Sequence, residues 1–479
     1  MRVLHVSSEL APFAQTGGMG DVLAGLPGAQ AALGFDAAVL VPLYRGVAER
    51  LAAAGHPLDA HPLPIVLGPH RFEAVLRSAR IGRVRCGFLD IPALYDRAGG
   101  LYGPGGTAEF GDNHVRFAAL GKAALAAGAH LLGGVDVVHA HDWQGAPAAI
   151  YAHLERPGTS IVTTIHNLAF RGIFGKHVLP ELGIPWSLFT TRLLEFYDQL
   201  SLLKGGLALA DAVTTVSPTY AHEILTPERG EALDGFLRWD VKRLVGIANG
   251  IDAAAWNPAT DAALPARFSA RELAGKRACR EALCAEAGLP PPDDQTPIIG
   301  VVSRLSYHKG SDLIADLAPS LGELGARLVL IGNGEPALED RLQNLARSFP
   351  DRVAVRIGFD HAYARRVYAG SDLFAMPSRF EPCGLGQLYA MRYGAVPIVH
   401  AVGGLRDTVT DPSAVRGTPT GLRFDEASAG ALYVASARAV ALFRDAAAFA
   451  ALRRGAMARD SSWTVPAHEY VQIYRSLRA

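Results

Sequence analysis

Residues 2–27, RVLHVSSELAPFAQTGGMGDVLAGLP, decide the fold class because they run from a strand-like segment through a glycine loop into a helix-like segment. Similar short β-rich runs recur along the chain, each followed by a glycine-containing loop and a helix-like segment. Strands that are apolar throughout and separated by helices indicate buried parallel sheets with right-handed crossovers. The sequence therefore predicts a doubly wound α/β fold.

The spacing of these runs predicts two domains. The runs are VLHVS, AAVLVP, VDVVHA, SIVTTIH and AVTTVS, followed later by IIGVVSR, RLVLIG, RVAVRIG, DLFAMPS and VPIVHA. Between the two series, residues 257–297 hold one polar helix-like segment, 270–287, and the proline-rich GLPPPDDQTP. Because 479 residues exceed what one core usually serves, we expect two Rossmann-like domains, 1–250 and 251–455, facing each other across a cleft.

Composition narrows the class of protein. Lys plus Arg equal Asp plus Glu at 46 each, so no net field recruits nucleic acid or an anionic membrane. The four cysteines lack paired CxxC spacing, which favours a reducing cytoplasm over a zinc site or a disulfide framework. The first apolar run is too short for a signal peptide, and we expect no window to approach the ~18 apolar residues of a membrane span.

The opening glycine loop matches neither common nucleotide fingerprint. It lacks the GK[ST] ending of a P-loop, and Leu23 occupies the last glycine position of G-x-G-x-x-G. Adjacent glycines still let backbone amides approach a phosphate or a sugar, and Asp21 is expected to cap the helix that Pro27 later bends or interrupts. The alternative is a tight turn that only packs.

A later loop, LVLIGNGEPA, matches G-x-G-x-x-A after a strand and raises a dinucleotide-binding alternative. Such a site needs an acidic residue at the end of the next strand to bind the ribose. RVAVRIG ends without one, and Asp360 follows only after a turn residue, so the match is weak evidence for a nicotinamide cofactor.

Two loops of the second half place charges where a phosphate leaving group could bind. SRLSYHKG carries Arg304 and Lys309 in one strand-to-helix loop, a pairing that suits a diphosphate, although solvated surface charges are the alternative. In MPSRFEPCGLGQ, Glu381 lies beside the amides of 384–386 at a helix start. These amides would hold a departing diphosphate while the carboxylate contacts the sugar.

Polar residues end two strands of the first half. VVHAHDWQ contains His139, His141, Asp142 and Trp143, and TTIHNLAF ends a strand with His166 and Asn167. His-x-His-Asp suggests a metal site, because residues i and i+2 of a strand point the same way. The further ligands are missing at hydrolase-like spacing, which favours a sugar site with an apolar tryptophan wall and polar partners for hydroxyl groups.

Taken together, the ordered motifs resemble the bacterial members of the starch and glycogen synthase family, retaining glycosyltransferases with the two-domain GT-B fold. The motifs are TGGMGDV, HAHDW, IHNLAFRG, LKGGLALADAVTTVSPTYA, NGIDAAAWNP, SRLSYHKG and RFEPCGLGQLYAMRYG followed by GGLRDTV, and the match continues to DSSWTVPAHEYVQIYRSL. The resemblance implies transfer of glucose from ADP-glucose to the non-reducing 4-OH of an α-1,4-glucan such as glycogen, with retention and without a metal or organic cofactor. It also implies that a helix within 456–479 returns to the first domain.

The resemblance also implies roles for single residues. Arg304 and Lys309 would hold the diphosphate, Glu381 would contact the donor glucose, and His166 would lie against the reacting face. Tyr95 and Phe359 would lie near the nucleotide base. The other substrate positions that it implies are Gln15, Gly17, Gly18, Asp21, Asp142, Trp143, Asn167, Asn249, Cys383, Gly384, Leu385, Gly386, Gly403, Gly404 and Thr408.

The departures from the family pattern concentrate at the donor site. Gln15 replaces a lysine, Met19 a leucine, Gly386 a threonine and His400 an arginine. Fewer cations near the leaving group should weaken transition-state stabilisation by roughly 1–3 kcal/mol per lost contact. Three alternatives therefore stay open: a catalytically weakened glucan-binding or nucleotide-sugar-binding homologue, a transferase that uses UDP-glucose, and, least favoured, a dinucleotide oxidoreductase.

Overall fold

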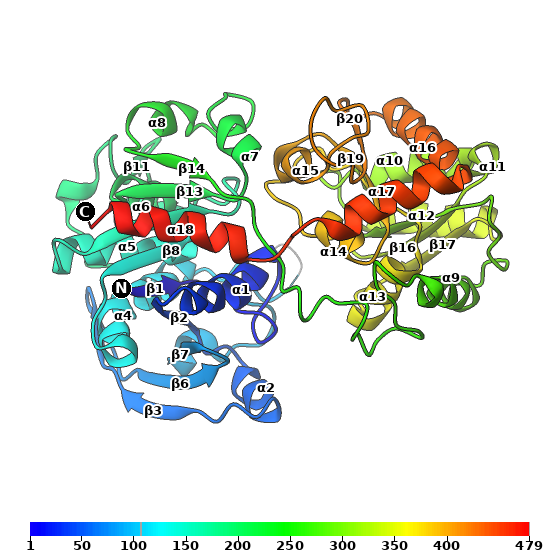
Figure 1. Ribbon diagram of the computed structural model, residues 1–479. Helices are drawn as coiled ribbons and strands as arrows, with labels where there is room; N and C mark the ends of the chain where they lie inside the picture. Colours follow the sequence, from blue (N-terminus) through cyan, green and yellow to red (C-terminus); the bar gives the residue numbers. More distant parts are fainter. Residues whose placement is uncertain (106–107, 479) are drawn as a thin grey trace. The chain divides into compact units, whose positions relative to one another are not determined.

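The computed structural model describes residues 1–105 and 108–478, and it divides into two compact units (Figure 1). Unit 1 comprises Met1–Gly250 and Trp463–Ala479, and unit 2 comprises Ile251–Ser462. The chain thus leaves unit 1 after the Asn-Gly pair at which the first domain was expected to end. It leaves unit 2 at Ser462, later than the expected residue 455, because helix α17 (Ala446–Ala458) still packs on the second sheet.

Unit 1 is built on a nine-stranded sheet in the order β14-β13-β9-β8-β1-β2-β7-β6-β3. Its strands are β1 (Arg2–Val6), β2 (Asp36–Pro42), β3 (Asp59–Pro62), β6 (Val75–Ile81), β7 (Val84–Asp90), β8 (Val137–His141), β9 (Ser160–Ile165), β13 (Ala212–Thr215) and β14 (Leu244–Gly246). Small antiparallel sheets contain β4 (Ile65–Leu67), β5 (His70–Phe72), β10 (Ile173–Gly175), β11 (Glu195–Phe196) and β12 (Gln199–Ser201). The sheet is parallel from β14 to β7, and only β6 and β3 pair antiparallel.

The helices of unit 1 connect these strands. They are α1 (Gly18–Ala32), α2 (Val47–Ala53), α3 (Pro92–Tyr95), α4 (Asn113–Leu132), α5 (Asp142–Glu155), α6 (Leu202–Ala208), α7 (Pro218–Glu223), α8 (Asp234–Trp239) and α18 (Thr464–Ser476), with 3-10 turns at Lys176–Val178 and Trp186–Leu188. The order of strands reverses between β1 and β8, so the loops after these two strands leave the sheet at its switch point. That is where an open α/β sheet binds ligands.

Unit 2 is a six-stranded, fully parallel sheet in the order β17-β16-β15-β18-β19-β20. The strands are β15 (Ile298–Val302), β16 (Arg327–Gly332), β17 (Val353–Ile357), β18 (Leu373–Met376), β19 (Val396–His400) and β20 (Leu422–Phe424). The helices are α9 (Ala274–Ala287), α10 (Ser311–Leu317), α11 (Leu321–Leu324), α12 (Pro336–Ser348), α13 (His361–Gly370), α14 (Gly386–Arg392), α15 (Gly403–Thr408), α16 (Ala429–Arg444) and α17, with a 3-10 turn at Ala318–Ser320. Here the switch point lies between β15 and β18.

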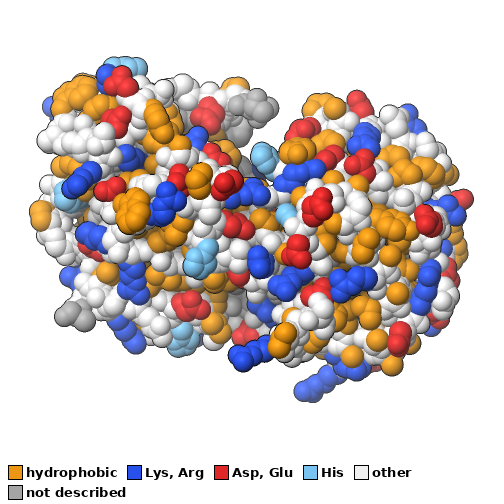
Figure 2. Space-filling view, turned by 90° about the horizontal axis from the view of Figure 1, so that it is seen from above, with side chains coloured by type: hydrophobic (Ala, Val, Ile, Leu, Met, Phe, Trp, Pro, Cys, Tyr) orange, Lys and Arg blue, Asp and Glu red, His pale blue; other side chains and the backbone are white. Residues whose placement is uncertain are grey.

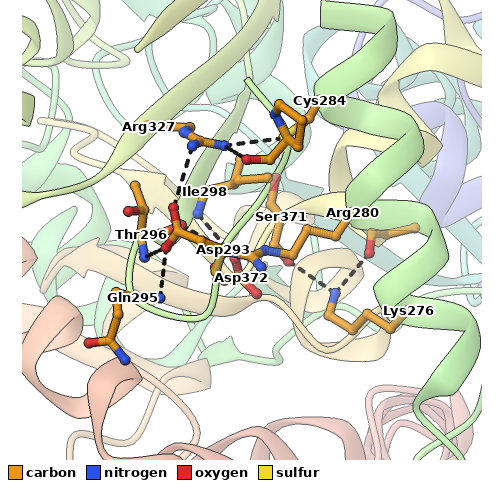
Figure 3. Close-up of polar contacts among 12 residues, drawn as sticks. Lys276, Arg280, Cys284, Asp293, Gln295, Thr296, Ile298, Arg327, Ser371 and Asp372 are labelled. Carbon is orange, nitrogen blue, oxygen red and sulfur yellow. Dashed lines mark hydrogen bonds and ion pairs between the residues drawn. The ribbon is translucent and has the colours of Figure 1, made fainter. Parts of the chain in front are cut away.

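Helix α9 fills the expected gap between the two series of strands, and buried polar contacts hold it to the second sheet (Figure 3). Lys276 donates hydrogen bonds to the carbonyls of Ala369, Ser371 and Tyr393 at 2.9, 3.0 and 2.8 Å. One turn later, Arg280 Nε pairs with Asp372 at 2.8 Å. Each buried charge therefore has its partners, as burial of a charge requires.

The C-terminal helix α18 lies among the elements of unit 1, where Figure 1 shows it in red beside the blue helix α1. The indole of Trp463, the residue before α18, packs against α1 so closely that a Cβ on Gly25 would lie 2.0 Å from its Nε1 atom. Glycine at this position therefore makes the approach of the two helices possible.

Helix α4 corrects one expectation from the sequence. It is long and apolar enough to cross a membrane by length and composition, but 72% of the relevant window is buried inside the fold. Burial against the sheet and α5 accounts for its composition, as in the core helix of a water-soluble domain. Figure 2 shows basic and acidic side chains interspersed on the face in view, in keeping with the balanced charge of the chain.

Candidate active site

The strand-to-helix loops at the switch point of unit 2 enclose a cavity of about 190 Å³. Its lining includes Arg304 and Lys309 after β15, and Glu381 and the segment 384–386 after β18. The fold therefore brings together the charged residues that the sequence analysis predicted in two separate loops. They meet because β15 and β18 are neighbours in the sheet, so the carboxyl ends of both strands open on the same side.

Lys309 and Glu381 form an ion pair in this cavity. Lys309 Nζ lies 2.8 and 2.6 Å from the two carboxylate oxygens of Glu381, and Ser378 Oγ donates to the same carboxylate at 3.0 Å. The Glu381 side chain is only 7% exposed, whereas the Lys309 side chain is 34% exposed. Arg304 is exposed at the cavity rim, and its guanidinium has no ion pair within the described part of the chain. The cavity thus combines a neutralised carboxylate with a cation that can bind an anion.

A second ion pair fixes the two loops to each other. Arg379 binds Asp312 with two bonds of 2.7 and 2.8 Å, and its guanidinium lies 3.7 Å above the ring of Tyr307. The backbone amide of Arg379 also donates to the carbonyl of His308 at 2.8 Å. These contacts link the Arg304–Lys309 loop to the Glu381 loop, so the charges of the cavity are held in position.

Glycines bring the loop before α15 against the carbonyl of Glu381. Gly403 has φ of +44°, and a Cβ there would lie 2.0 Å from that carbonyl oxygen, while the Gly404 amide donates to it at 3.2 Å. Thr408 was expected to bind substrate, but it is buried and bonded to Gly404 O and Gln387 Nε2. The buried hydroxyl of Thr408 therefore holds this loop in place through these two hydrogen bonds. Cys383 is buried in the same segment, and its carbonyl accepts from Gln387 at 3.2 Å.

In unit 1, the loops after β8 and β9 place Asp142 and His166 in contact. Asp142 is the first residue of α5 and has φ of 52°, a left-handed conformation that is uncommon for a residue with a side chain. Its Oδ1 accepts from the amides of His166 and Asn167 at 2.7 and 3.3 Å. Burial raises the pKa of Asp142 to about 7, partly offset by these two bonds.

Histidine side chains gather on one face of this sheet. The register pairs His5 on β1 with His139 on β8, and His141 lies two residues along the same strand. His5, His139 and His141 could each offer a ligand atom within 4.8 Å of the others, but this cluster includes His5, which the His-x-His-Asp pattern did not contain, and leaves out Asp142. Both ring nitrogens of each are already hydrogen-bonded to protein groups, and the absence of a resident metal stays a prediction.

The glycine loop departs from what the sequence predicted. Asp21 does not cap α1; Gly17 is the N-cap residue, and the Asp21 carboxylate, in the first turn, accepts instead from Gln15 Nε2 at 2.7 Å. The Gly17 amide was expected to face a phosphate, but it donates to the carboxylate of Glu9 at 3.2 Å, beside the Thr16 amide at 2.9 Å. Gly18 begins the helix. Burial raises the pKa of Asp21 to about 6.

Two predicted aromatic contacts are also not available in this structure. Tyr95 is buried in unit 1 and donates its hydroxyl to the carbonyl of Arg116 at 2.6 Å. Trp143 is buried between the rings of Phe117 and Phe174, so it forms core rather than an open wall for a sugar. Phe359, by contrast, is 68% exposed and can offer a ring face.

Comparison with known proteins identifies the family. The family described as "Starch synthase catalytic domain" matches residues 2–239, and "Glycosyl transferases group 1" matches residues 290–441. A glycogen synthase of Anaeromyxobacter dehalogenans (strain 2CP-C) is 47% identical over 485 residues, covering 100% of both chains. The chain belongs to the starch and glycogen synthase family.

Other members of the family match over the same length. A glycogen synthase of Myxococcus xanthus (strain DK1622) is 44% identical, covering 100% of both chains. The catalytic domain of starch synthase IV from Arabidopsis thaliana, solved bound to ADP and acarbose, aligns with a TM-score of 0.89 at 31% identity and covers 100% of this chain and 99% of that one. The chain is accordingly a glycosyltransferase with the GT-B fold.

Family motifs pointed to most of the cavity but missed several supporting residues. Glu9 holds the glycine loop and accepts from Tyr102 Oη at 2.7 Å, and its place just after β1 was the available signal. Gln30 and Tyr474 bond to the histidines from α1 and α18, where no motif marked them. Asn249, which was predicted, is buried with Oδ1 unbonded among the described residues.

Proposed function

We propose that this enzyme transfers glucose from ADP-glucose to the non-reducing 4-OH of an α-1,4-glucan such as glycogen, with retention at the anomeric carbon. The observation that carries the proposal is the Lys309–Glu381 pair in the unit 2 cavity, with Arg304 at its rim. A nucleotide sugar presents an anionic diphosphate joined to a neutral, hydroxyl-rich ring. The cavity offers cations for the first part and a buried carboxylate for the second.

In the reaction, the bond from C1 of glucose to the diphosphate breaks, a bond from C1 to the acceptor O4 forms, and the proton of the acceptor 4-OH passes to the departing diphosphate. Negative charge develops on the departing diphosphate, and the cations of Arg304 and Lys309 would stabilise it. The Leu385 and Gly386 amides at the start of α14 would add hydrogen bonds to it. Glu381 would hold a hydroxyl of the glucose, because its carboxylate is buried and fixed by Ser378.

The residues proposed for the sugar site in unit 1 are Asp142, His166, Asn167 and Asn249. The orphaned Oδ1 of Asn249 suits a hydroxyl donor, because a buried acceptor without a partner costs free energy until one is supplied. Asn167 Oδ1 accepts from the Ala169 amide at 3.0 Å, and this bond orients the side chain so that its amide nitrogen can donate to a sugar hydroxyl.

ADP-glucose is the proposed donor because the related starch synthase was solved with ADP. The cavity residues themselves suit a diphosphate but do not distinguish one nucleotide base from another. Phe359 remains the candidate for stacking on the adenine, and Tyr95 would have to leave the core to reach a ligand. We place the enzyme in the cytoplasm, because its cysteines are free in the described residues, as is usual in a reducing compartment.

The experiment is incorporation of labelled glucose into glycogen by the purified enzyme, with ADP-glucose and UDP-glucose competing in one assay. Glu381→Ala and Lys309→Ala should each lose nearly all incorporation. Arg341→Ala is the matched control, because it breaks an exposed ion pair with Asp316 in the same unit and should leave the rate unchanged. Absence of transfer from either nucleotide sugar to several primers would overturn the proposal.

A second candidate is a homologue that binds glucan or nucleotide sugar with weakened catalysis. It is favoured by Gln15, whose amide bonds to Gly17 O and Asp21 rather than offering a cation. Gln15→Lys should raise kcat if that missing charge limits the rate. If the wild-type rate is low and Gln15→Lys leaves it unchanged, the missing positive charge at this position does not limit kcat.

A further inference from the structure

A chain of hydrogen-bonded imidazoles runs behind His166. His166 Nε2 lies 2.9 Å from His141 Nδ1, His141 Nε2 lies 3.0 Å from His5 Nδ1, and His5 Nε2 lies 2.8 Å from Gln30 Oε1. His166 directly follows β9, His141 ends β8 and His5 lies on β1, three neighbouring strands, and the links end on helix α1. The sheet therefore connects a proposed site residue beyond the carboxyl end of β9 to a buried glutamine.

The three hydrogen-bonded imidazole rings, those of His166, His141 and His5, are neutral. Burial lowers the pKa of His5 to about 4 and that of His166 to about 3, and it holds the pKa of His141 well below its ordinary value. A neutral imidazole carries one proton, on one of two nitrogens, so each link needs one ring to donate and the next to accept.

Gln30 sets the direction of every link. Its Oε1 can only accept, so His5 carries its proton on Nε2 and accepts at Nδ1. His141 must then donate from Nε2 and accept at Nδ1, and His166 must donate from Nε2. This leaves Nδ1 of His166 as a lone pair with no hydrogen-bond partner in residues 1–105 and 108–478.

A second arm of hydrogen bonds is compatible with this orientation of Gln30. Gln30 Nε2 donates to Tyr474 Oη at 3.0 Å, and Tyr474 lies 2.7 Å from His139 Nδ1. With the tyrosine hydrogen directed to His139, that ring donates from Nε2 to Thr164 Oγ1 at 2.6 Å. Tyr474 belongs to α18, so the C-terminal helix contacts the amide on which both arms depend.

We propose that Gln30 and Tyr474 are positioning residues that hold His166 in its neutral Nε2–H form, so that Nδ1 accepts a hydrogen bond from a hydroxyl of the bound sugar. This inference rests on the proposed function for the identity of the ligand, but the state of the ring is a property of the protein alone. A flipped Gln30 amide would reverse every link and make His166 Nδ1 a donor. The two directions of hydrogen bonding therefore differ in which nitrogen of His166 carries the proton, and this difference can be measured.

The direct test is nitrogen NMR of the full-length enzyme labelled with ¹⁵N-histidine, with His166 assigned by loss of its signals in His166→Gln. We expect the protonated nitrogen of His166, His141 and His5 to be Nε2, without titration between pH 5.5 and 8.5. An Nδ1–H form, or protonation of the His166 ring within that range, would overturn the proposal. This result does not depend on turnover, so failure of the proposed function would be seen separately in the glucose transfer assay.

Variants of Gln30 test the consequence for catalysis. Gln30→Met removes the acceptor that orients His5, and we expect mixed tautomers at His166 together with a fall in kcat/KM of about three- to tenfold. Gln30→Glu keeps an acceptor for His5 Nε2–H in either protonation state of the carboxyl group, so it should retain both the tautomer of His166 and the rate. A slowed Gln30→Met enzyme that keeps the Nε2–H form would contradict the link between tautomer and rate.

Tyr474→Phe and Tyr151→Phe form a matched pair. Each removes a buried tyrosine hydroxyl of unit 1; among the described residues, that of Tyr151 bonds only to the carbonyl of Leu182, at 2.7 Å, outside the network. Tyr474→Phe should shift the His139 signals and mix the His166 tautomers, and Tyr151→Phe should change neither. Equal effects of the two variants would mean that the hydroxyl acts only through stability.

Discussion

At the scale of single residues, Asp142 combines an unfavourable backbone conformation with an unfavourable protonation state. Its φ of 52° lies in the left-handed region, and its buried carboxyl has a pKa of about 7. Both features cost stability, and the bonds to the amides of His166 and Asn167 hold the side chain in place. Such strain is common where a site needs a group in one fixed position.

Asp142→Asn should make the protein more stable at pH 8 and inactive. The pKa of this carboxyl is higher in the folded chain than its model value of 3.8, so the folded state binds more protons between about pH 4 and pH 7. The contribution of Asp142 to stability therefore falls as pH rises through that window. Asparagine keeps an acceptor, tolerates positive φ and does not ionise, so it should gain about 2–4 kcal/mol at pH 8.

The measurement for Asp142→Asn is urea unfolding of both proteins at pH 5 and pH 8. The advantage of the variant should be larger at pH 8 than at pH 5. An equal difference at the two pH values would show that Asp142 does not change its protonation state on folding. Glucose transfer, measured on the same samples, should be lost because the carboxylate is proposed to bind the sugar.

At the scale of elements, the approach of α1 to the start of α18 depends on one glycine. Alanine is favoured over glycine inside a helix by about 1 kcal/mol, but a Cβ on Gly25 would lie 2.0 Å from Trp463 Nε1. Gly25→Ala should therefore destabilise unit 1 by about 1–3 kcal/mol, since the indole cannot move without leaving the core.

Gly28→Ala is the control on the same helix, because a Cβ there meets no atom within 4 Å. It should stabilise the protein by about 0.5–1 kcal/mol. Thermal unfolding followed by circular dichroism measures both variants. Shifts of the same sign would contradict the packing of Trp463 on α1.

The buried lysine of α9 makes a parallel prediction for unit 2. Burial lowers the pKa of Lys276 to about 7, and its Nζ donates to three carbonyls. Lys276→Met should cost about 2–4 kcal/mol, because the carbonyls lose their donor. Arg277→Met on the same helix, where the side chain is 77% exposed, should change stability by less than about 0.5 kcal/mol.

The pH dependence of Lys276 has the opposite sign to that of Asp142. Because the pKa of the lysine is lower in the folded chain than its model value of 10.5, the folded state binds fewer protons between about pH 7 and pH 10.5. Its contribution to stability therefore rises with pH in that window. Urea unfolding at pH 7 and pH 9 should show a larger gain in unfolding free energy for the wild type than for Lys276→Met, and an equal gain would contradict the lowered pKa of this amine.

At the scale of the whole molecule, the sequence predicted what depends on strand order and missed what depends on packing. Lys309 and Glu381 were placed in separate loops that both follow parallel strands, and β15 and β18 do bring them together. Tyr95 and Thr408 match family positions, yet neighbouring elements bury both. Glu9 escaped notice because a carboxylate bonded to loop amides has no spacing signature.

Binding of ADP should stabilise unit 2 without requiring the acceptor, since Arg304, Lys309 and the 384–386 amides all belong to that unit. At a concentration 100 times the dissociation constant, a ligand adds about 2.7 kcal/mol to the state that it binds. Hydrogen exchange measured by mass spectrometry should therefore show protection of peptides covering 303–310 and 377–386.

Lys309→Ala should remove that protection, whereas Arg341→Ala, which breaks a surface pair in the same unit, should retain it. Protection confined to peptides of unit 1 would place the diphosphate on unit 1, and the assignment of donor and acceptor sites to the two units would then have to be exchanged.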